Sequence, residues 1–179
     1  AYQVPTIDAP MSGGPLRAEQ GTMSLMVACE DAVFAAHENL LNTLSNQVFR
    51  ISQRLGDGAR TKLVNNFLAG INLVGAAEAM ALAERLGLSL PTTLSVIAQS
   101  SGQSWIGSDR MQRALQNDWA PRAHMSLLTK DTALAQQAAH SVGFQGVLGQ
   151  QAVKAFADAS AAGLADLDDA AMLQWLRQK

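Results

Sequence analysis

The sequence predicts a mainly α-helical protein in which a small α/β segment precedes an all-helical part. Residues 1–55 alternate between strand-like and helix-like stretches, residues 59–86 form one proline-free run, and the rest divides at glycines and prolines into helix-length pieces. The pattern changes near Gly56 to Gly58. We therefore expect an incomplete α/β domain over residues 1–57 and an all-α domain over residues 58–179.

The composition fits one packed domain, or one domain plus a partial one. Apolar residues make up 48% of the 179 residues and aromatic residues only 5%, so the core must consist mainly of aliphatic side chains and alanine. The net charge is -2 without a basic run, which argues against nucleic-acid binding. The single cysteine, Cys29, excludes an internal disulfide, and the three histidines lack metal-ligand spacing. We expect no metal site and a reducing, cytoplasmic setting.

Two periodicities define the α/β segment. Val4 to Asp8 is a short stretch that we expect to be a strand ending at a proline, and Thr22 to Ala28 alternates with its larger apolar residues on one face. Glu30 to Leu44 has helical spacing, and Gln47 to Ser52 alternates again. This strand–helix–strand order is too small for a complete doubly wound sheet. Ala1 to Pro5 show neither the basic nor the apolar part of a signal peptide.

The run from Ala59 to Leu86 predicts a long central helix that ends at Gly87. At about 1.5 Å per residue it is about 40 Å long. Its long middle stretch carries Glu78 as the only charge, so the helix must be buried on nearly every side, and a partner subunit is expected to cover part of it. The most apolar part, residues 67–77, is shorter than a bilayer requires and contains Asn72, so no membrane span is expected.

The remaining chain predicts shorter helices separated by breaks. Pro91 suits the first turn of one of them, Asp118 to Pro121 is expected to be a loop, and Gly143 and Gly163 mark breaks. The expected helices are 91–100, 104–116, 126–142, 146–162 and 168–178.

A first candidate site follows the first expected strand, at Ser12-Gly13-Gly14. Small residues let backbone N–H groups converge on a ligand, and the serine hydroxyl adds a donor, so this segment can cradle a carboxylate or a phosphate. The other interpretation is a simple turn before a helix.

A second candidate site lies at the start of the long helix. Lys62 and Asn66 are four residues apart and therefore share one helix face, where the apolar stretch begins. A lysine that loses solvent there gives up its proton more readily and can serve as acid or base, while a neutral amide can orient a substrate. Alternatively, the lysine extends to solvent and the amide is structural. Gly56 and Gly58 match a dinucleotide-binding fingerprint only in part, because its third glycine is absent.

A third motif, Lys130-Asp131, means little alone, because such pairs are usually solvated. Together, the order and separation of the three motifs resemble the β-hydroxyacid dehydrogenases, the family of 3-hydroxyisobutyrate, tartronate-semialdehyde and threonate-type enzymes. The matching segments are Asp-Ala-Pro-x-Ser-Gly-Gly, Gly-x-Gly-x-x-x-Lys-x-x-x-Asn and Lys-Asp-x-x-x-Ala. The resemblance covers essentially the whole chain. It implies the all-α C-terminal domain of the 6-phosphogluconate dehydrogenase type, preceded by a remnant of a Rossmann sheet.

The resemblance also implies a function. The substrate is a small 3-hydroxy acid or sugar acid, which NAD or NADP oxidises to a semialdehyde or keto acid. The homodimer is instead expected from the cover that the long apolar helix needs, and we expect it to form through that helix and the C-terminal helices. Lys62 is implied to be the general acid or base and Asn66 to orient the substrate. The substrate-binding residues are Ser12, Gly13, Gly14 and Trp105, and the cofactor contacts are Lys130 and Asp131. From the residues alone, Trp105 lines the pocket or belongs to the core, and Arg122 meets a second polar group or lies on the surface.

The sequence also departs from the family. Its usual Gly-x-Gly-x-x-Gly turn is not found, so we expect part of the nucleotide-binding domain to lie outside this chain and the isolated chain to be inactive. Ala28-Cys29 stands where the family has Gly-Gly. An imine reductase is one alternative, but those enzymes usually lack the catalytic lysine that Lys62 matches. A non-catalytic dimerisation domain is the other, and the presence of the expected site residues argues against it.

Overall fold

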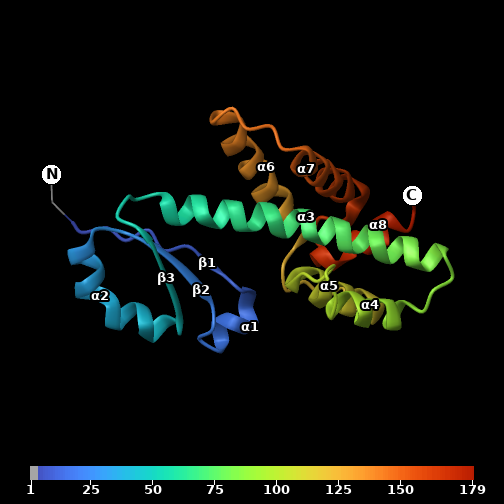
Figure 1. The fold of residues 1–179 in the computed structure, drawn as a ribbon, viewed down its shortest axis with the longest axis horizontal. Coiled ribbons are helices and arrows are strands. Elements are labelled where there is room, and N and C mark those ends of the chain that lie inside the picture. Colours follow the sequence, from blue (N-terminus) through green and yellow to red (C-terminus); the bar gives the residue numbers. More distant parts are fainter. Residues whose placement is uncertain (1–3) are drawn as a thin grey trace. The chain divides into compact units, whose positions relative to one another are not determined.

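The computed structural model describes residues 4–179, which form two compact units (Figure 1). The first unit comprises residues up to Asn65, and the helical unit comprises residues 66–179. The long helix α3 (Asp57–Arg85) begins in the first unit and continues into the helical unit. The expected domain division at 57/58 therefore coincides with the start of α3, whereas the two compact units divide inside this helix.

A three-stranded sheet organises the first unit. Its strands are β1 (Met11–Ser12), β2 (Ser24–Ala28) and β3 (Gln47–Ser52), in the order β1-β2-β3. The β1–β2 pair is antiparallel, and β2–β3 is parallel, joined through α2 (Asp31–Leu44). The buried cluster of this unit includes Cys29, which behaves as a small apolar side chain. Its buried members are Leu25, Val27, Cys29 and Leu41.

One local expectation in this unit was wrong. Residues 4–8 form no strand; Asp8 makes a single antiparallel bridge to Ala28. Proline has no N–H to donate, and Pro5 lies within this stretch while Pro10 follows it, so a longer hydrogen-bonded ladder is disfavoured. The sequence also gave no separate prediction for the short helix α1 (Gly14–Glu19).

Helices make up the helical unit. After α3 come α4 (Leu90–Ala98), α5 (Trp105–Leu115), α6 (Met125–Ser141) and α7 (Val147–Ala159). The chain then forms a π-helical turn (Ser160–Leu164), a 3-10 turn (Asp169–Ala171) and the short helix α8 (Met172–Leu176). The expected helix over 168–178 is therefore broken in two. The breaks at Gly87, Gly143 and Gly163 are confirmed, since all three have positive φ values of 71°, 72° and 91°.

The chain buries one face of α3. Gly70, Leu73, Ala77 and Met80 recur at helical spacing and are buried, and the last three are fully buried. The opposite face stays exposed, with Leu68 and Leu82 at 56% and 57% exposure. The expectation of burial on nearly every side is therefore not met by this chain alone. By length and composition α3 could also cross a membrane, a test that the core helices of soluble proteins pass as well, and 33% of its most apolar window is buried here.

Candidate active site

The segment Ser12-Gly13-Gly14 forms a turn between β1 and α1. Gly13 has a φ of 135° and Gly14 a φ of 72°, and residues with a Cβ atom rarely adopt such values. A Cβ on Gly13 would also lie 2.7 Å from the Arg17 Cδ atom. The two glycines are therefore required by the backbone of this turn, whether or not it also receives a ligand.

The turn into α3 is tied directly to the first motif. The Asp8 carboxylate accepts hydrogen bonds from the backbone N–H groups of Gly56 (2.9 Å) and Ala59 (3.2 Å). A Cβ on Gly58 would lie 2.4 Å from the backbone oxygen of Met26, so this glycine allows the helix start to approach β2. Asp8 thus joins two motifs that are about fifty residues apart, a role that the sequence alone did not reveal.

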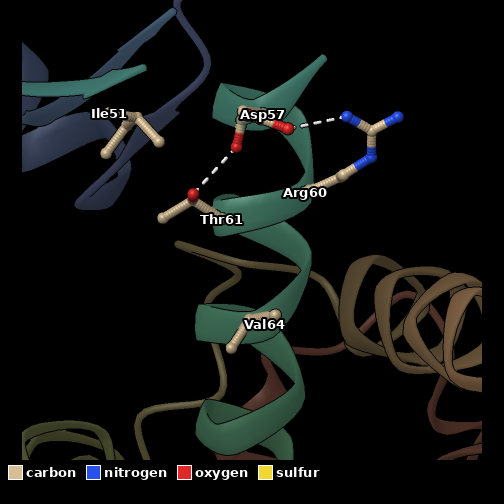
Figure 2. Close-up of a pocket in the computed structure, with 5 residues that line it drawn as sticks. All are labelled: Ile51, Asp57, Arg60, Thr61 and Val64. Carbon is tan, nitrogen blue, oxygen red and sulfur yellow. Dashed lines mark hydrogen bonds and ion pairs between the residues drawn. The ribbon is translucent and has the colours of Figure 1, made fainter. Parts of the chain in front are cut away.

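A second carboxylate orders the same turn. Hydrogen bonds from Arg54, Ser52 and Arg60 hold the pKa of the Asp57 carboxyl well below its usual range. Figure 2 shows a shallow hollow beside it, lined by Ile51, Asp57, Arg60, Thr61 and Val64.

This hollow is distinct from the candidate catalytic face. At about 100° per residue, positions 57, 61 and 64 lie on one side of α3, and positions 62 and 66 lie on nearly the opposite side. Lys62 is half-buried. The hollow in Figure 2 therefore does not contain the predicted catalytic pair.

In the helical unit, a chain of polar contacts joins the second and third motifs. The Asn66 amide donates a hydrogen bond of 2.6 Å to Asp131 Oδ2, and the Lys130 ammonium lies 2.9 Å from Asp131 Oδ1. The Asp131 side chain is 14% exposed, whereas that of Lys130 is 62% exposed. Asp131 is therefore an anchored carboxylate that positions one group from each motif, and its cationic neighbour remains accessible to an anionic ligand.

Two close helix contacts fix this arrangement. A Cβ on Gly70 would lie 2.6 Å from Thr132 Cγ2, and a Cβ on Gly149 would lie 1.9 Å from Phe67 Cζ. Glycine at these positions lets α3 approach α6 and α7 directly beside Asn66 and Asp131. The packing thereby holds the two polar partners in register.

Trp105 begins α5 and is exposed at 53%, so it is not a core residue of this chain. The Arg110 guanidinium carbon lies 5.9 Å from the centre of its ring. The sequence left pocket and core open for Trp105; the exposure argues against the core, and the pocket role stays a prediction. Arg122 is also largely exposed and pairs with Asp118 at 3.3 Å.

A buried ionic cluster in the helical unit was not foreseen. Asp168 and Asp169 are buried and face Arg110 and Arg113 from α5; Arg113 Nη1 lies 2.9 Å from Asp168. Burial raises the pKa of Asp169 to about 7, although the charge of Arg110 opposes the shift. Burial acts in the same direction on Asp168, but hydrogen bonds from the Ala170 N–H, from Arg113 and from other backbone N–H groups outweigh it and lower its pKa. Periodicity gave no sign of this cluster, because its partners are about 60 residues apart.

Over residues 4–179, no group of three or more His, Cys, Asp or Glu side chains is arranged to hold a metal ion. The polar centre of the helical unit instead combines a neutral amide, a carboxylate and an accessible ammonium. Together with the preceding parallel βαβ segment, these features agree with the class that the motifs predict, a dehydrogenase with an all-α C-terminal domain.

Comparison with known families agrees with this class. The family model described as NAD-binding of NADP-dependent 3-hydroxyisobutyrate dehydrogenase matches residues 56–176, and that of the NAD binding domain of 6-phosphogluconate dehydrogenase matches residues 1–52. The chain therefore belongs to the 3-hydroxyisobutyrate dehydrogenase-like family, as the motifs predicted.

Individual relatives support the same assignment. The chain is 33% identical to L-threonate dehydrogenase of Pectobacterium atrosepticum over 97% of its own length and 57% of the relative's. The crystal structure of 3-hydroxyisobutyrate dehydrogenase from Salmonella typhimurium has a TM-score of 0.89 at 35% identity, over 96% of this chain and 60% of that one. An imine reductase from Myxococcus stipitatus is more distant, with a TM-score of 0.50 at 18% identity. The chain thus spans less than two thirds of the length of these relatives.

Proposed function

We propose that this chain is the substrate-binding and assembly part of an NAD(P)-dependent dehydrogenase. The enzyme would interconvert a small 3-hydroxy acid or sugar acid and its semialdehyde or keto acid. One observation carries the proposal: Asn66, Asp131 and Lys130 form a connected polar centre, with Lys62 one turn before Asn66 on the same helix. Family membership supplies the reaction class.

Each residue has a chemical task in this proposal. Ser12, Gly13 and Gly14 bind the substrate carboxylate through hydroxyl and backbone N–H donors. The Lys62 side-chain nitrogen takes the proton from the alcohol oxygen during oxidation and returns it during reduction. Asn66, held by Asp131, orients the alcohol.

NAD or NADP, when bound, takes the hydride from the carbon that bears the alcohol. An exposed ammonium next to an anchored carboxylate fits a cofactor that carries phosphates and hydroxyl groups. We therefore assign Lys130 and Asp131 to the cofactor side of the site. Because this chain represents part of its relatives' length, the remaining cofactor contacts are expected elsewhere in the full-length protein, and the isolated chain is expected to be inactive.

Substitution of Lys62 tests the proposal. In the full-length protein, Lys62→Ala should lower kcat by about 10²- to 10⁴-fold, the usual contribution of a general acid or base, with little change in melting temperature. Lys154→Ala is the matched control, because Lys154 lies on α7, is 70% exposed and pairs with Asp158. Near-normal turnover by Lys62→Ala would contradict the catalytic assignment and would favour a non-catalytic dimerisation domain.

The choice of substrate needs a direct screen. Relatives are named for L-threonate, 2-(hydroxymethyl)glutarate and 3-hydroxyisobutyrate. We propose a sugar acid such as L-threonate, because the matches to L-threonate dehydrogenases are the stronger ones and Ser104-Trp105 fits that group. A thermal-shift screen of these acids with NAD and with NADP should show the largest stabilisation for L-threonate. No stabilisation by any of them would contradict the assignment.

We also propose a homodimer in the cytoplasm, formed through α3 and the C-terminal helices. On the exposed face of α3, Leu68 and Leu82 flank Gly75. Among the described glycines with a helical backbone, Gly75 alone has open space where a Cβ would lie. Glycine costs a helix about 1 kcal/mol relative to alanine, so its presence suggests a close neighbour outside this chain.

Sedimentation of the full-length protein should therefore give a dimer at micromolar concentration. Gly75→Leu should dissociate it without unfolding the protein, whereas Ala79→Ser, one turn away on the same exposed face, should leave the assembly intact. A monomeric parent protein would contradict the proposed dimer.

A further inference from the structure

The start of α3 is bonded to the segment that leads into the first motif. Asp8 Oδ2 accepts hydrogen bonds from the backbone N–H groups of Gly56 (2.9 Å) and Ala59 (3.2 Å), and all three residues belong to the first compact unit. N–H groups at the start of a helix have no partner within the helix, so an acceptor from elsewhere fixes the place where the helix begins. Asp8 is that acceptor for α3.

Asp8 is itself held firmly along β2. Its backbone N–H and C=O both form hydrogen bonds with Ala28, at 3.0 and 2.8 Å. Pro10 and Ser12, further along the same segment, are also paired with β2. The segment is therefore fixed to the sheet from Asp8 up to the proposed carboxylate cradle, Ser12-Gly13-Gly14.

Lys62 lies on the face of α3 that meets this segment. A Cβ on Gly58 would lie 2.4 Å from the Met26 backbone oxygen and 3.0 Å from Asp8 Oδ2, so position 58 faces β2 and Asp8 directly. Four residues later, at about 100° per residue, Lys62 lies within about 40° of the same direction and about 6 Å further along the helix. Because Cα–Cβ bonds tilt toward the N-terminus of a helix, the Lys62 side chain starts out toward this contact. Its half-buried state agrees with this placement.

We propose that Asp8 is a positioning residue for Lys62. By joining the start of α3 to the segment that carries the carboxylate cradle, Asp8 fixes the distance between Lys62 and the carboxylate of the bound acid. The proposal rests on the proposed function, in which Lys62 exchanges the proton of the alcohol. A displacement of about 1 Å in a catalytic group can lower the rate about 100-fold. The effect should appear in kcat, whereas KM should change little, because the cradle still binds the carboxylate.

The test replaces Asp8 in the full-length protein, with L-threonate as the probe substrate and saturating NAD or NADP. Asp8→Ala should lower kcat about 10- to 100-fold and change the KM for L-threonate by less than about threefold. Asp8→Asn keeps a side-chain oxygen for the two N–H groups, so its kcat should stay within about threefold of the parent value. A parent-like kcat in Asp8→Ala would overturn the proposal.

Removal of Lys62 separates positioning from a merely structural role. In the Lys62→Ala background, Asp8→Ala should change the residual kcat by less than about twofold, because the group that Asp8 positions is gone. Effects on kcat that multiply would overturn the proposal. Near-normal turnover by Lys62→Ala alone would instead overturn the proposed function, so the two failures are distinguishable.

Asp57→Asn is the matched control at the same turn. The Asp57 carboxylate bonds only within β3, the following turn and α3, through Ser52, Arg54 and Arg60. Its loss should loosen this turn without releasing α3 from residues 8–12, so kcat should stay within about twofold of the parent value. A loss of kcat as large as that of Asp8→Ala would show general loosening of the helix start and would contradict the positioning role.

Gly58→Ala disturbs the same contact from the helix side and serves if Asp8→Ala does not fold. The added methyl group meets the Met26 backbone oxygen, so the start of α3 must shift while the Asp8 carboxylate remains. This variant should also lower kcat with little change in the KM for L-threonate. A folded Gly58→Ala protein with the parent's kcat would overturn the proposal.

Discussion

Replacement of Asp131 should separate the orientation of Asn66 from the chemistry of Lys62. Asp131 accepts a hydrogen bond of 2.6 Å from the Asn66 amide, and a hydrogen bond to an ionised acceptor contributes about 1.5 to 3 kcal/mol. Its ion pair with Lys130 adds little, since Lys130 is 62% exposed and such pairs contribute at most about 1 kcal/mol. If the bond orients Asn66 in the transition state, Asp131→Ala should lower kcat/KM by about 10- to 100-fold.

The assay is steady-state kinetics of the full-length protein in both reaction directions. Asp131→Asn should lower kcat/KM less than Asp131→Ala does, because its side-chain oxygen, although uncharged, still accepts a hydrogen bond from the Asn66 amide. At saturating NAD or NADP, where a cofactor contact of Asp131 no longer affects the rate, the double variant Asn66→Ala/Asp131→Ala should be no slower than Asn66→Ala alone, since both changes then remove the same interaction. Asp158→Asn makes the same charge change at an exposed ion pair on α7 and should have no effect. If the losses in kcat/KM from Asn66→Ala and Asp131→Ala simply multiply in the double variant, Asp131 does not act by orienting Asn66.

Three further predictions concern stability. Burial raises the pKa of Asp169 to about 7, so the stability that its protonated carboxyl contributes is present below pH 4 and is lost as the pH rises through about 7. The melting temperature should therefore fall from pH 5 to 8. In Asp169→Asn the melting temperature should depend less on pH over this range. Gly149→Val should cost about 1 to 3 kcal/mol of unfolding free energy in denaturant titrations, because its side chain meets Phe67, whereas Gly102→Ala, with its nearest atom at 3.7 Å, should change it little. Asp8→Ala should cost about 1 kcal/mol by removing the acceptor for two N–H groups at the start of α3, whereas a melting temperature equal to the parent's would contradict this role.

Local patterns predicted most of the helices and two strands correctly, with β2 (Ser24–Ala28) inside its expected range 22–28. β3 has the expected bounds Gln47–Ser52, and α3 and its end at Gly87 follow from a proline-free apolar run and a glycine that tolerates positive φ. The predicted domain boundary at 57/58 came from the change of periodicity there, and it coincides with the start of α3 at Asp57. In contrast, α1 is six residues long, too short for periodicity to show.

The candidate site was only partly predictable. Lys62 and Asn66 could be paired from their spacing on one helix, whereas the contact between Asn66 and Asp131 joins residues 65 positions apart and depends on tertiary packing. The cluster of Arg110 with Asp169 escaped prediction for the same reason, at a separation of 59 residues. A spacing rule reaches about one helical turn, so charges that meet through the fold remain invisible to it.

The glycine contacts beside Asn66 have a consequence for local opening. Phe67 fills the space above Gly149, and Gly70 faces the methyl group of Thr132, so three helices interlock within four residues of α3. No segment there can separate without losing all of these contacts together. The amide protons of residues 67–73 should therefore exchange with solvent only when the helical unit unfolds globally, whereas those of the exposed residues 142–145, between α6 and α7, should exchange by local fluctuation.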